Sequence, residues 1–420
     1  MGRAEVRRLT GLAGFRALWV GQLVSIFGDR FHYLALLALL VARARQPENP
    51  APELAVVPLV SFLPAILFGP IAGPLVDRWN VKRVLVVSDA IRGALVLLLI
   101  PAATWGGLPA AFAVVFALYV ANTFFLPARS AILPRIVPPE TLVTANSLAT
   151  LAGVLATLAG SYFGGWVVER VGWRWGFLID AATYFASVAA LALIPFAAGP
   201  GGAGGVPRAA PRPASPYRDL ARSLAEGVRA TARDRRALGS IAALTLLWAA
   251  GGVLHVAGTL LVKERMSAMV AGIGSLLAAA GLGMVLGVAL LSAFGDRARG
   301  GPLAAGALGG LGVALIAFAF ARSSAALHLA AFVAGLFVAA LLIVTEAAIQ
   351  RAIAPETRGR VFALRDLVTR VAVLVSAGAA GVVVGRGMVR PGAAVAAAGA
   401  LLAAVALAGL IVGAARGGTR

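Results

Sequence analysis

Three ionisable residues lie close together in an otherwise apolar stretch near the start of the chain: Asp29, Arg30 and His32. On a helix, Asp29 and His32 share a face because they are three positions apart, whereas Arg30 points about 100° away. Burial disfavours the charged form of a carboxylate, so an acid here could take up and release protons. Asp29 and Arg30 could instead form a structural pair with the fourth or fifth spanning helix.

Other ionisable residues also interrupt apolar stretches, where a charge is costly and is therefore a candidate for function. Asp180 and Glu346 have no opposite charge close by in the sequence. We expect each of them either to carry a proton or to be hydrogen-bonded to a neighbouring helix. Asp89 and Arg92 are three positions apart, and we expect them to pair within one helix. The candidates for proton coupling are Asp29, His32, Asp180 and Glu346.

Side chains for a substrate pocket are expected on several spanning helices. Arg129 follows Pro127, which cannot donate a backbone hydrogen bond and can kink a helix, so Arg129 could point inward. There it could neutralise an anionic substrate, or it could pair with Asp29 or Glu140. The aromatic candidates could instead face lipid or neighbouring helices. The pocket candidates are Phe27, Arg30, Phe31, Tyr119, Asn122, Phe124, Arg129, Tyr184 and Trp248.

The composition indicates what positions these side chains. The chain has 420 residues, of which 60% are hydrophobic and 13% charged, whereas about 25% are charged in an average soluble domain. The apolar residues form runs of about 20, the length that crosses the hydrocarbon core of a bilayer as a helix. Backbone groups find no water partners there, so helices are the expected spanning form. The sequence predicts an all-α membrane protein.

Several classes of function are excluded by residue types or missing motifs. The chain has no cysteine, and its histidines His32, His255 and His328 show no metal-ligand spacing, so no metal site is expected. No phosphate-binding loop or nucleophile elbow is present, so no enzyme activity and no cofactor are expected. The net charge of +20 is attributed to loops that set membrane orientation rather than to nucleic-acid binding.

Hydropathy windows predict twelve spans, six in each half of the chain. We expect an N-terminal bundle over 1–196, a linker with a short basic amphipathic helix over 197–236, and a C-terminal bundle over 237–420. Lys and Arg concentrate on the side of the N-terminus, which predicts an inner or plasma membrane protein with both termini cytoplasmic. The spans are 16–42, 52–76, 83–104, 108–128, 142–168, 174–196, 238–262, 268–294, 301–321, 325–349, 361–386 and 391–415.

A weak internal repeat supports this division. Three short identities recur in the same order in the second half, at nearly constant offset and at the same point of a six-span unit. Two parallel six-helix repeats place a substrate path between them, near the middle of the membrane. The matches are Arg16-Ala-Leu18 with Arg236-Ala-Leu238, Asp77-Arg78 with Asp296-Arg297, and Pro139-Glu-Thr141 with Pro355-Glu-Thr357.

The polar turn between the second and third spans carries a recognisable pattern. Gly73-x-Leu75-x-Asp77-Arg78 followed by Lys82-Arg83 resembles the signature loop of the major facilitator superfamily. Asn80 replaces the usual glycine, and we expect it to tolerate a left-handed backbone there. A weaker copy of the turn lies at Gly295–Arg299.

The glycines of the fifth span extend the resemblance to one branch of that family. Gly153, Gly160, Gly164 and Gly165 resemble the antiporter motif of drug and metabolite exporters, with Ser161 in place of a proline. Their role could be to limit proton leak or simply to let helices pack closely. The segment Leu126–Ser147 also resembles macrolide and enterobactin exporters.

The resemblance implies a conformational latch at the signature turn. Asp77 would dock near the start of the eleventh span, which Arg365, Asp366 and Arg370 are expected to open. Arg78 and Arg83 would add salt bridges to other acids. The turn could instead only reverse the chain. The latch candidates are Gly73, Asp77, Arg78, Arg83, Asp89, Glu140 and Asp366.

Together, these features predict a monomeric secondary transporter in the lipid bilayer. We expect alternating access driven by the proton gradient, with efflux of a small molecule that is hydrophobic and drug-like, or of a siderophore. A lysophospholipid transporter on the same fold is the alternative. A receptor or membrane enzyme that transports nothing fits the repeat and the latch less well.

Overall fold

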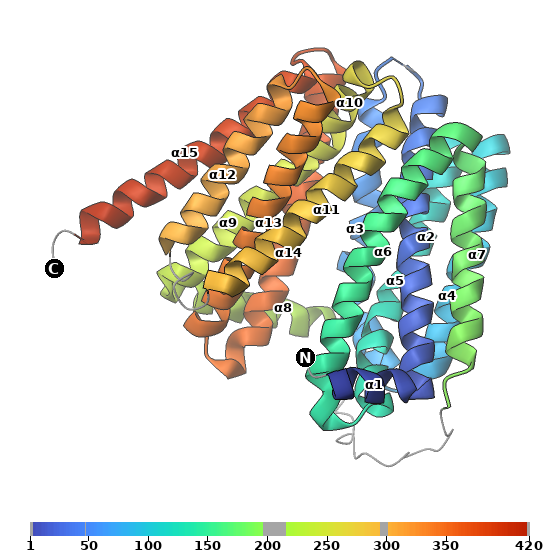
Figure 1. The fold of residues 1–420 in the computed structure, drawn as a ribbon. Helices are drawn as coiled ribbons and strands as arrows, with labels where there is room; N and C mark the ends of the chain where they lie inside the picture. Colours follow the sequence, from blue (N-terminus) through green and yellow to red (C-terminus); the bar gives the residue numbers. More distant parts are fainter. Residues whose placement is uncertain (1–2, 47, 196–215, 295–300, 418–420) are drawn as a thin grey trace. The chain divides into compact units, whose positions relative to one another are not determined.

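A computed structural model of the protein describes residues 3–46, 48–195, 216–294 and 301–417. These residues form helices joined by short connections, and they contain no β-strand. Twelve helical segments are long and apolar enough to cross a membrane (Figure 1). The predicted all-α fold with twelve transmembrane helices is confirmed.

The first six spanning helices follow the predicted ranges closely, except at the end of the fourth. Helix α5 continues through Pro127 and Pro134 to Ile136, whereas the prediction ended at residue 128. The hydropathy window stopped early because Arg129 and Arg135 lower the mean hydropathy of the last turns. The helices are α2 (Ala13–Arg43), α3 (Ala51–Val76), α4 (Val81–Trp105), α5 (Gly107–Ile136), α6 (Leu142–Val171, after a 3₁₀ turn at Pro139–Thr141) and α7 (Trp173–Ala192).

The second six spans show one larger difference. Helix α14 begins at Pro355 rather than at residue 361, because proline is well accommodated at a first helical position. Arg365, Asp366 and Arg370 therefore lie about three to four turns inside α14 and do not open it. The helices are α9 (Arg235–Val253), which continues through a π-helical turn (Leu254–Gly258) into α10 (Thr259–Arg265), α11 (Met269–Phe294), α12 (Gly301–Phe320), α13 (Ser324–Ala352), α14 (Pro355–Gly385) and α15 (Pro391–Gly417).

Two further helices do not span. Helix α1 covers Arg3–Gly11, and α8 covers Pro216–Arg233, where the sequence predicted a basic amphipathic helix over 217–234. The first part of the predicted linker, 197–215, lies outside the described residues. The second copy of the signature turn, Gly295–Arg299, lies outside them as well.

The described residues group into two compact units. The first draws on Met1–Arg43 and Val60–Tyr217, and the second on Ala44–Leu59 and Arg218–Arg420. Helix α3 is therefore divided: its first turns belong to the second unit and the rest belongs to the first.

In the first unit, α2 packs against α6 and α7, and α4 packs against α5 and α7. Gly172 joins α6 to α7 with a φ of 90°, a left-handed conformation that favours glycine. A Cβ atom at Gly28 of α2 would collide with Thr183 of α7. The close approach of α2 and α7 therefore requires a glycine at position 28, and it brings polar side chains of both helices together.

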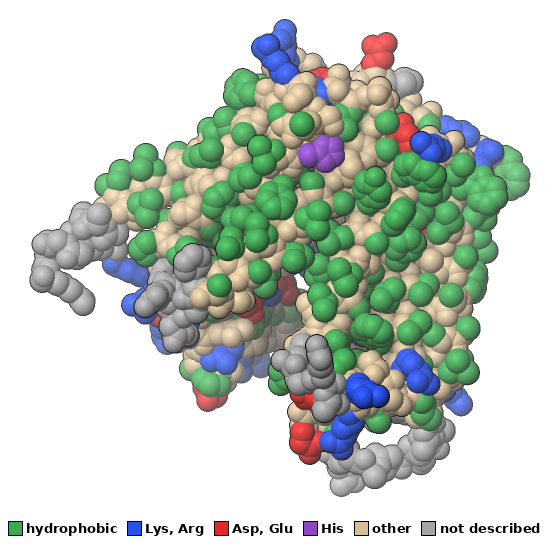
Figure 2. All heavy atoms as spheres, in the orientation of Figure 1, with side chains coloured by type: hydrophobic (Ala, Val, Ile, Leu, Met, Phe, Trp, Pro, Cys, Tyr) green, Lys and Arg blue, Asp and Glu red, His purple; other side chains and the backbone are tan. Residues whose placement is uncertain are grey.

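In the second unit, α11 packs against α13, α12 against α15, and α9 against α14. A Cβ atom at Gly312 of α12 would lie 2.5 Å from the carbonyl oxygen of Gly399 in α15, so these backbones are in near contact. Small residues allow such close packing in membranes. Figure 2 shows hydrophobic side chains along the visible helices and charged side chains gathered towards helix ends, as a bilayer requires.

Candidate functional site

A buried pair of ionisable side chains joins α2 to α7 in the first unit. His32 Nδ1 lies 3.3 Å from Asp180 Oδ2, and the two side chains are 6% and 0% exposed. Neither side chain has a hydrogen bond of good geometry among the described residues. Both residues were predicted as proton carriers, but the sequence did not indicate that they meet. The two groups are adjacent and enclosed, so the interaction between α2 and α7 at this point depends on the charge of the Asp180 carboxyl.

Asp29 lies on the same helix as His32 and contacts the same partner helix. The hydroxyl of Tyr184 donates a hydrogen bond of 2.6 Å to Asp29 Oδ1. Tyr184 is four residues after Asp180, so one face of α7 presents both groups to α2. One alternative was that Asp29 and Arg30 form a structural pair with the fourth or fifth span. The hydrogen-bond partner of Asp29 lies instead on the sixth, α7, whereas Arg30 packs against Gly160 of the fifth, α6.

Arg92 of α4 extends this polar cluster into the rest of the first unit. Its guanidinium group forms the expected ion pair with Asp89 and donates a hydrogen bond of 3.2 Å to Asn122 Oδ1. It also lies 4.0 Å from the ring centre of Phe125 and 4.6 Å from that of Tyr184. Tyr184 therefore contacts both Asp29 and Arg92. The cluster links α2, α4, α5 and α7.

Ser187 was missed by the sequence analysis because a serine on an apolar helix carries no signal of its own. Its hydroxyl donates a hydrogen bond of 2.7 Å to Asp89 Oδ2. Asp89 is completely buried and is satisfied by Ser187 and Arg92. Asp89 therefore lies in the core of the first unit and pairs with Arg92. It does not form the salt bridge with Arg78 or Arg83 that the resemblance implied.

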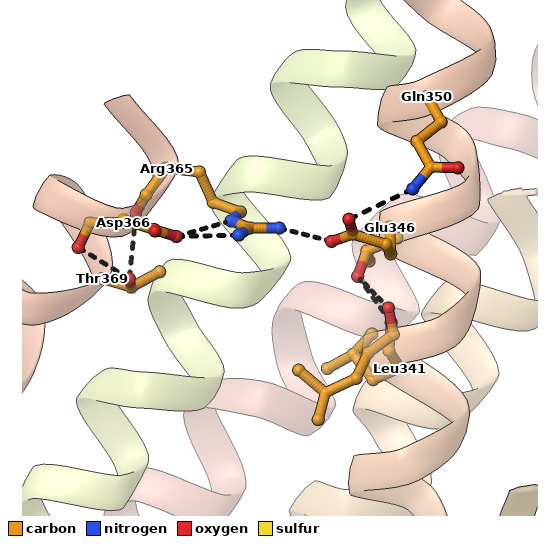
Figure 3. Close-up of polar contacts among 8 residues, drawn as sticks. Leu341, Glu346, Gln350, Arg365, Asp366 and Thr369 are labelled. Carbon is orange, nitrogen blue, oxygen red and sulfur yellow. Dashed lines mark hydrogen bonds and ion pairs between the residues drawn. The ribbon is translucent and has the colours of Figure 1, made fainter. Parts of the chain in front are cut away.

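A second polar cluster lies in the other unit (Figure 3). Arg365 of α14 forms an ion pair with Glu346 of α13 and donates a hydrogen bond of 2.8 Å from Nη2 to Asp366 Oδ1. Gln350 donates to the other Glu346 oxygen at 3.3 Å. Glu346 was expected either to carry a proton or to be hydrogen-bonded to a neighbouring helix. The structure shows that it bonds to a neighbouring helix, α14. The Glu346 side chain is 42% exposed, unlike the enclosed His32–Asp180 pair.

The signature turn has a different local structure from the one expected. Asn80 is the N-cap of α4, with a φ of −68°, and its side chain accepts a hydrogen bond of 3.0 Å from the Arg83 backbone. No left-handed residue is needed there, because the asparagine caps the helix instead. Lys82 donates hydrogen bonds of 2.7 Å to the carbonyl oxygens of Ala192 and Ile194 at the end of α7.

A groove of about 450 Å³ runs beside this turn, within the first unit. Trp79 stacks on Phe124 with ring centres 6.1 Å apart, and Arg83 contributes a cation to the groove. Of the aromatic pocket candidates, Phe124 is the one that lines this space. The lining residues are Trp79, Asn80, Arg83, Val84, Val87, Ser88, Ile91, Ala121 and Phe124.

The remaining candidates are not gathered at one place. Phe31 is buried and packs on Phe27, with ring centres 5.0 Å apart. Trp248 is 42% exposed on α9. Arg129 is half-buried on α5, and Glu140 is exposed on the 3₁₀ turn before α6.

The glycines of α6 pack directly against α2. A Cβ atom at Gly160 would lie 2.6 Å from the Phe27 carbonyl oxygen and 3.0 Å from the Arg30 side chain. At Gly164 it would lie 3.3 Å from Phe31 and Leu34, while Gly165 is buried. These contacts support the close-packing interpretation of the glycine motif. At Gly153 the same atom would have only Ile26 nearby, at 3.5 Å.

We therefore expect Gly160→Ala to destabilise the first unit by about 1–3 kcal/mol, because a backbone atom stands where the new methyl group must go. Gly153→Ala is the matched control and should leave stability nearly unchanged. Thermal unfolding of the two purified variants in detergent checks this. Equal melting temperatures would show that α2 and α6 separate at little cost.

Residues 44–59 of the second unit form another set of contacts that the sequence did not reveal. Asn49 Nδ2 donates hydrogen bonds of 3.1 and 3.2 Å to the carbonyl oxygens of Val384 and Gly385, at the end of α14. Lys263 Nζ donates to the Glu48 carbonyl at 3.3 Å. His255 Nε2, in the π-helical turn, lies 3.1 Å from the Leu54 carbonyl oxygen. The segment before α3 and the first turn of that helix are therefore held by α10, α14 and the π-helical turn.

Twelve helices that are long and apolar enough to cross a membrane, with a buried acid–imidazole pair between two of them, fit a helical membrane transporter. Among the described residues, no group of three or more His, Asp or Glu side chains could hold a metal ion. The chain belongs to the Major Facilitator Superfamily, whose sequence profile matches residues 18–273. The resemblance inferred from the signature turn is thus confirmed.

Curated relatives match part of the chain. Macrolide efflux protein A of Streptococcus pyogenes is 32% identical over 130 residues, which are 30% of this chain and 31% of that protein. The lysophospholipid transporter LplT of Cronobacter sakazakii is 32% identical over 185 residues, 43% of each chain. An uncharacterized MFS-type transporter of Mycobacterium tuberculosis is 34% identical over 161 residues, 37% of this chain and 36% of its own. The matches thus cover less than half of these relatives.

Solved structures support the fold. A POT family transporter, crystallised with a thioalcohol-conjugated peptide, superposes with a TM-score of 0.70 at 13% identity and covers 94% of this chain and 96% of its own. A bacterial homologue of the human lysosomal transporter Spinster gives a TM-score of 0.61 at 15% identity, covering 96% of both chains. At such low identity the likeness shows the fold alone.

Proposed function

We propose that this transporter exports hydrophobic, drug-like molecules or a siderophore in exchange for protons. The observation that carries the proposal is the buried His32–Asp180 pair, 3.3 Å apart and shielded inside the first unit. An enclosed acid next to an imidazole is a suitable proton acceptor, because protonation changes the balance of charge where water cannot compensate. The named function of the macrolide efflux relative supports the direction of transport.

The geometry suggests how a proton changes the first unit. While Asp180 is ionised, it attracts His32 and draws α2 towards α7. A proton on Asp180 removes that attraction, which leaves the Asp29–Tyr184 hydrogen bond as the polar link between the two helices. Proton and substrate would then stabilise different conformations, the condition for coupling their movements.

We further propose the cellular setting expected from the sequence. The transporter works as a monomer in the inner or plasma membrane, with both termini in the cytoplasm and the proton gradient as its energy source. It alternates between inward-facing and outward-facing states, and the turn carrying Asp77, Arg78 and Arg83 latches one of them. No cofactor takes part.

The test measures proton movement in everted membrane vesicles with a pH-sensitive dye while a panel of compounds is added. Asp29→Asn and Asp180→Asn should each abolish substrate-triggered proton movement, because each replaces an ionisable group of the cluster with a neutral amide. Asp219→Asn is the control, since that acid is exposed on α8, outside the spans. Normal proton exchange in both cluster variants would refute the assignment of the proton site.

Lysophospholipid transport is the second candidate. It is favoured by the name of the Cronobacter relative and by the groove beside Trp79, whose walls are largely apolar and which contains the cation of Arg83. Such a groove suits an acyl chain with a phosphate at one end. Movement of labelled lysolipid without any proton signal, in the same vesicles, would replace the first proposal with this one.

A further inference from the structure

Helix α8 separates its charges from its buried residues along its whole length. Arg222, Arg229 and Arg233 recur at spacings that place them on one face of the helix. All three are exposed, and none has an ion-pair partner among the described residues. Gly227 and Thr231 are buried on the opposite face. The helix thus presents an arginine face, defined here as these three residues, on the side opposite Gly227 and Thr231; the acids Asp219 and Glu226 lie on the same side, so the face is basic by excess of arginine.

The docking surface is built on α14. A Cβ atom at Gly227 would lie 2.7 Å from the carbonyl oxygen of Arg360, so the two helix backbones nearly touch. Glu226 forms an ion pair with Arg360, which fixes the rotation of α8 about its axis. Figure 1 shows α8 crossing near the end of α14 that contains Pro355. The arginine face therefore has a defined orientation within the second unit.

The helix is also joined directly to a candidate membrane span. It ends at Arg233, and Asp234 caps the spanning helix α9 by accepting hydrogen bonds of 2.7 and 3.0 Å from the next backbone amides. Leu238, one turn into α9, is 50% exposed, as a lipid-facing residue would be. Arg233 and the exposed Arg235 and Arg236 therefore lie directly before, and in the first turn of, a helix that is long and apolar enough to cross a membrane.

We propose that the arginine face of α8 binds the headgroups of anionic phospholipids. Charge complementarity selects this partner, because clustered arginines next to a spanning helix attract the negative surface of a membrane. The attraction acts over a Debye length of about 8 Å, so the side chains do not have to enter the headgroup layer. The contact is independent of the transported substrate. It makes the environment of α8, and of the α14 segment on which α8 packs, depend on the lipid composition of the membrane.

The experiment uses the full chain, which naturally contains no cysteine. Ala225→Cys places one thiol at an exposed position of α8 for an environment-sensitive dye. The labelled protein is reconstituted into phosphatidylcholine vesicles with increasing fractions of phosphatidylglycerol. The dye emission should shift as the anionic lipid increases, and high salt should reverse the shift.

Replacing the arginine face (Arg222→Gln, Arg229→Gln, Arg233→Gln) should weaken the response to phosphatidylglycerol by on the order of a hundredfold. A control with Arg7→Gln, Arg8→Gln and Arg43→Gln removes the same charge from exposed positions elsewhere and should respond like the parent. Circular dichroism and thermal unfolding establish that the variants are folded. An equal response in vesicles with and without phosphatidylglycerol would overturn the proposal. So would a response to added RNA in place of anionic lipid.

Discussion

A chain that carries Ala51→Cys and Gly385→Cys is expected to lose transport under oxidising conditions and to regain it when a reductant is added. A Cβ atom at Gly385 lies 3.8 Å from the Cβ of Ala51, and the mean separation in disulfides is also about 3.8 Å. The ring of Pro52, 3.2 Å from the new Cβ, must give way slightly. The natural chain has no cysteine, so no other disulfide can form within it.

Transport should stop because the bridge fixes one end of a helix that belongs to both units. Residues Ala44–Leu59 are held by the second unit, while α3 from Val60 onward belongs to the first. Under the proposed alternating access, the halves rock against each other, and we expect the Asn49 and His255 contacts to open in one of the two states. A covalent link prevents opening, so the residual transport should equal the fraction of chains that remain reduced.

The single variants Ala51→Cys and Gly385→Cys, treated with the same oxidant, are the controls and should transport normally. Mass spectrometry after proteolysis measures how much of the double variant is bridged. Full bridging with undiminished transport would mean that residues 44–59 stay on the second unit throughout the cycle, which would contradict this part of the mechanism.

The second large effect concerns stability. Arg92→Met should destabilise the protein by about 3–5 kcal/mol, because it leaves the carboxylate of Asp89 buried without its ion-pair partner. Asp89 has no exposure to water, and among the described residues Ser187 is the donor that remains to it. The change also removes the guanidinium group that contacts the rings of Phe125 and Tyr184.

The double variant Asp89→Leu with Arg92→Met should recover most of that loss, since a buried ion pair can often be replaced by apolar side chains at little cost. Arg83→Met, on the exposed side of the same helix, is the matched control and should have a small effect. Unfolding by SDS, followed by circular dichroism, measures all three. If the single variant proved as stable as the parent, the cluster would not contribute to the stability of the first unit.

Much of the fold could be predicted because a bilayer imposes a length and an apolar composition on each span. The ends were harder to predict wherever charge continued into a helix. The start of α14 was placed late because Glu356, Arg358 and Arg360 resemble a loop in a hydropathy window. A proline at the first helical position was the signal that could have located it.

The candidate site was predictable residue by residue, but its pairing was not. Charges inside apolar runs identified Asp29, His32 and Asp180, because such residues are costly and rarely incidental. Their partners are distant in sequence, and Tyr184 is 155 positions from Asp29. Local spacing could reveal the Asp89–Arg92 pair, since both lie on one helix. It could not reveal contacts that arise only when helices pack.

The division of α3 between the two units has a consequence for cutting the chain into fragments. A cut in the linker between the two bundles separates the chain into halves of six spans. Residues 44–59, however, belong to the N-terminal fragment, although they pack on α10 and α14 of the C-terminal fragment. A C-terminal fragment alone would expose the carbonyl oxygens that Asn49 covers. Hybrids that join halves of two such transporters therefore need matched residues at this one segment, even when their linkers are interchangeable.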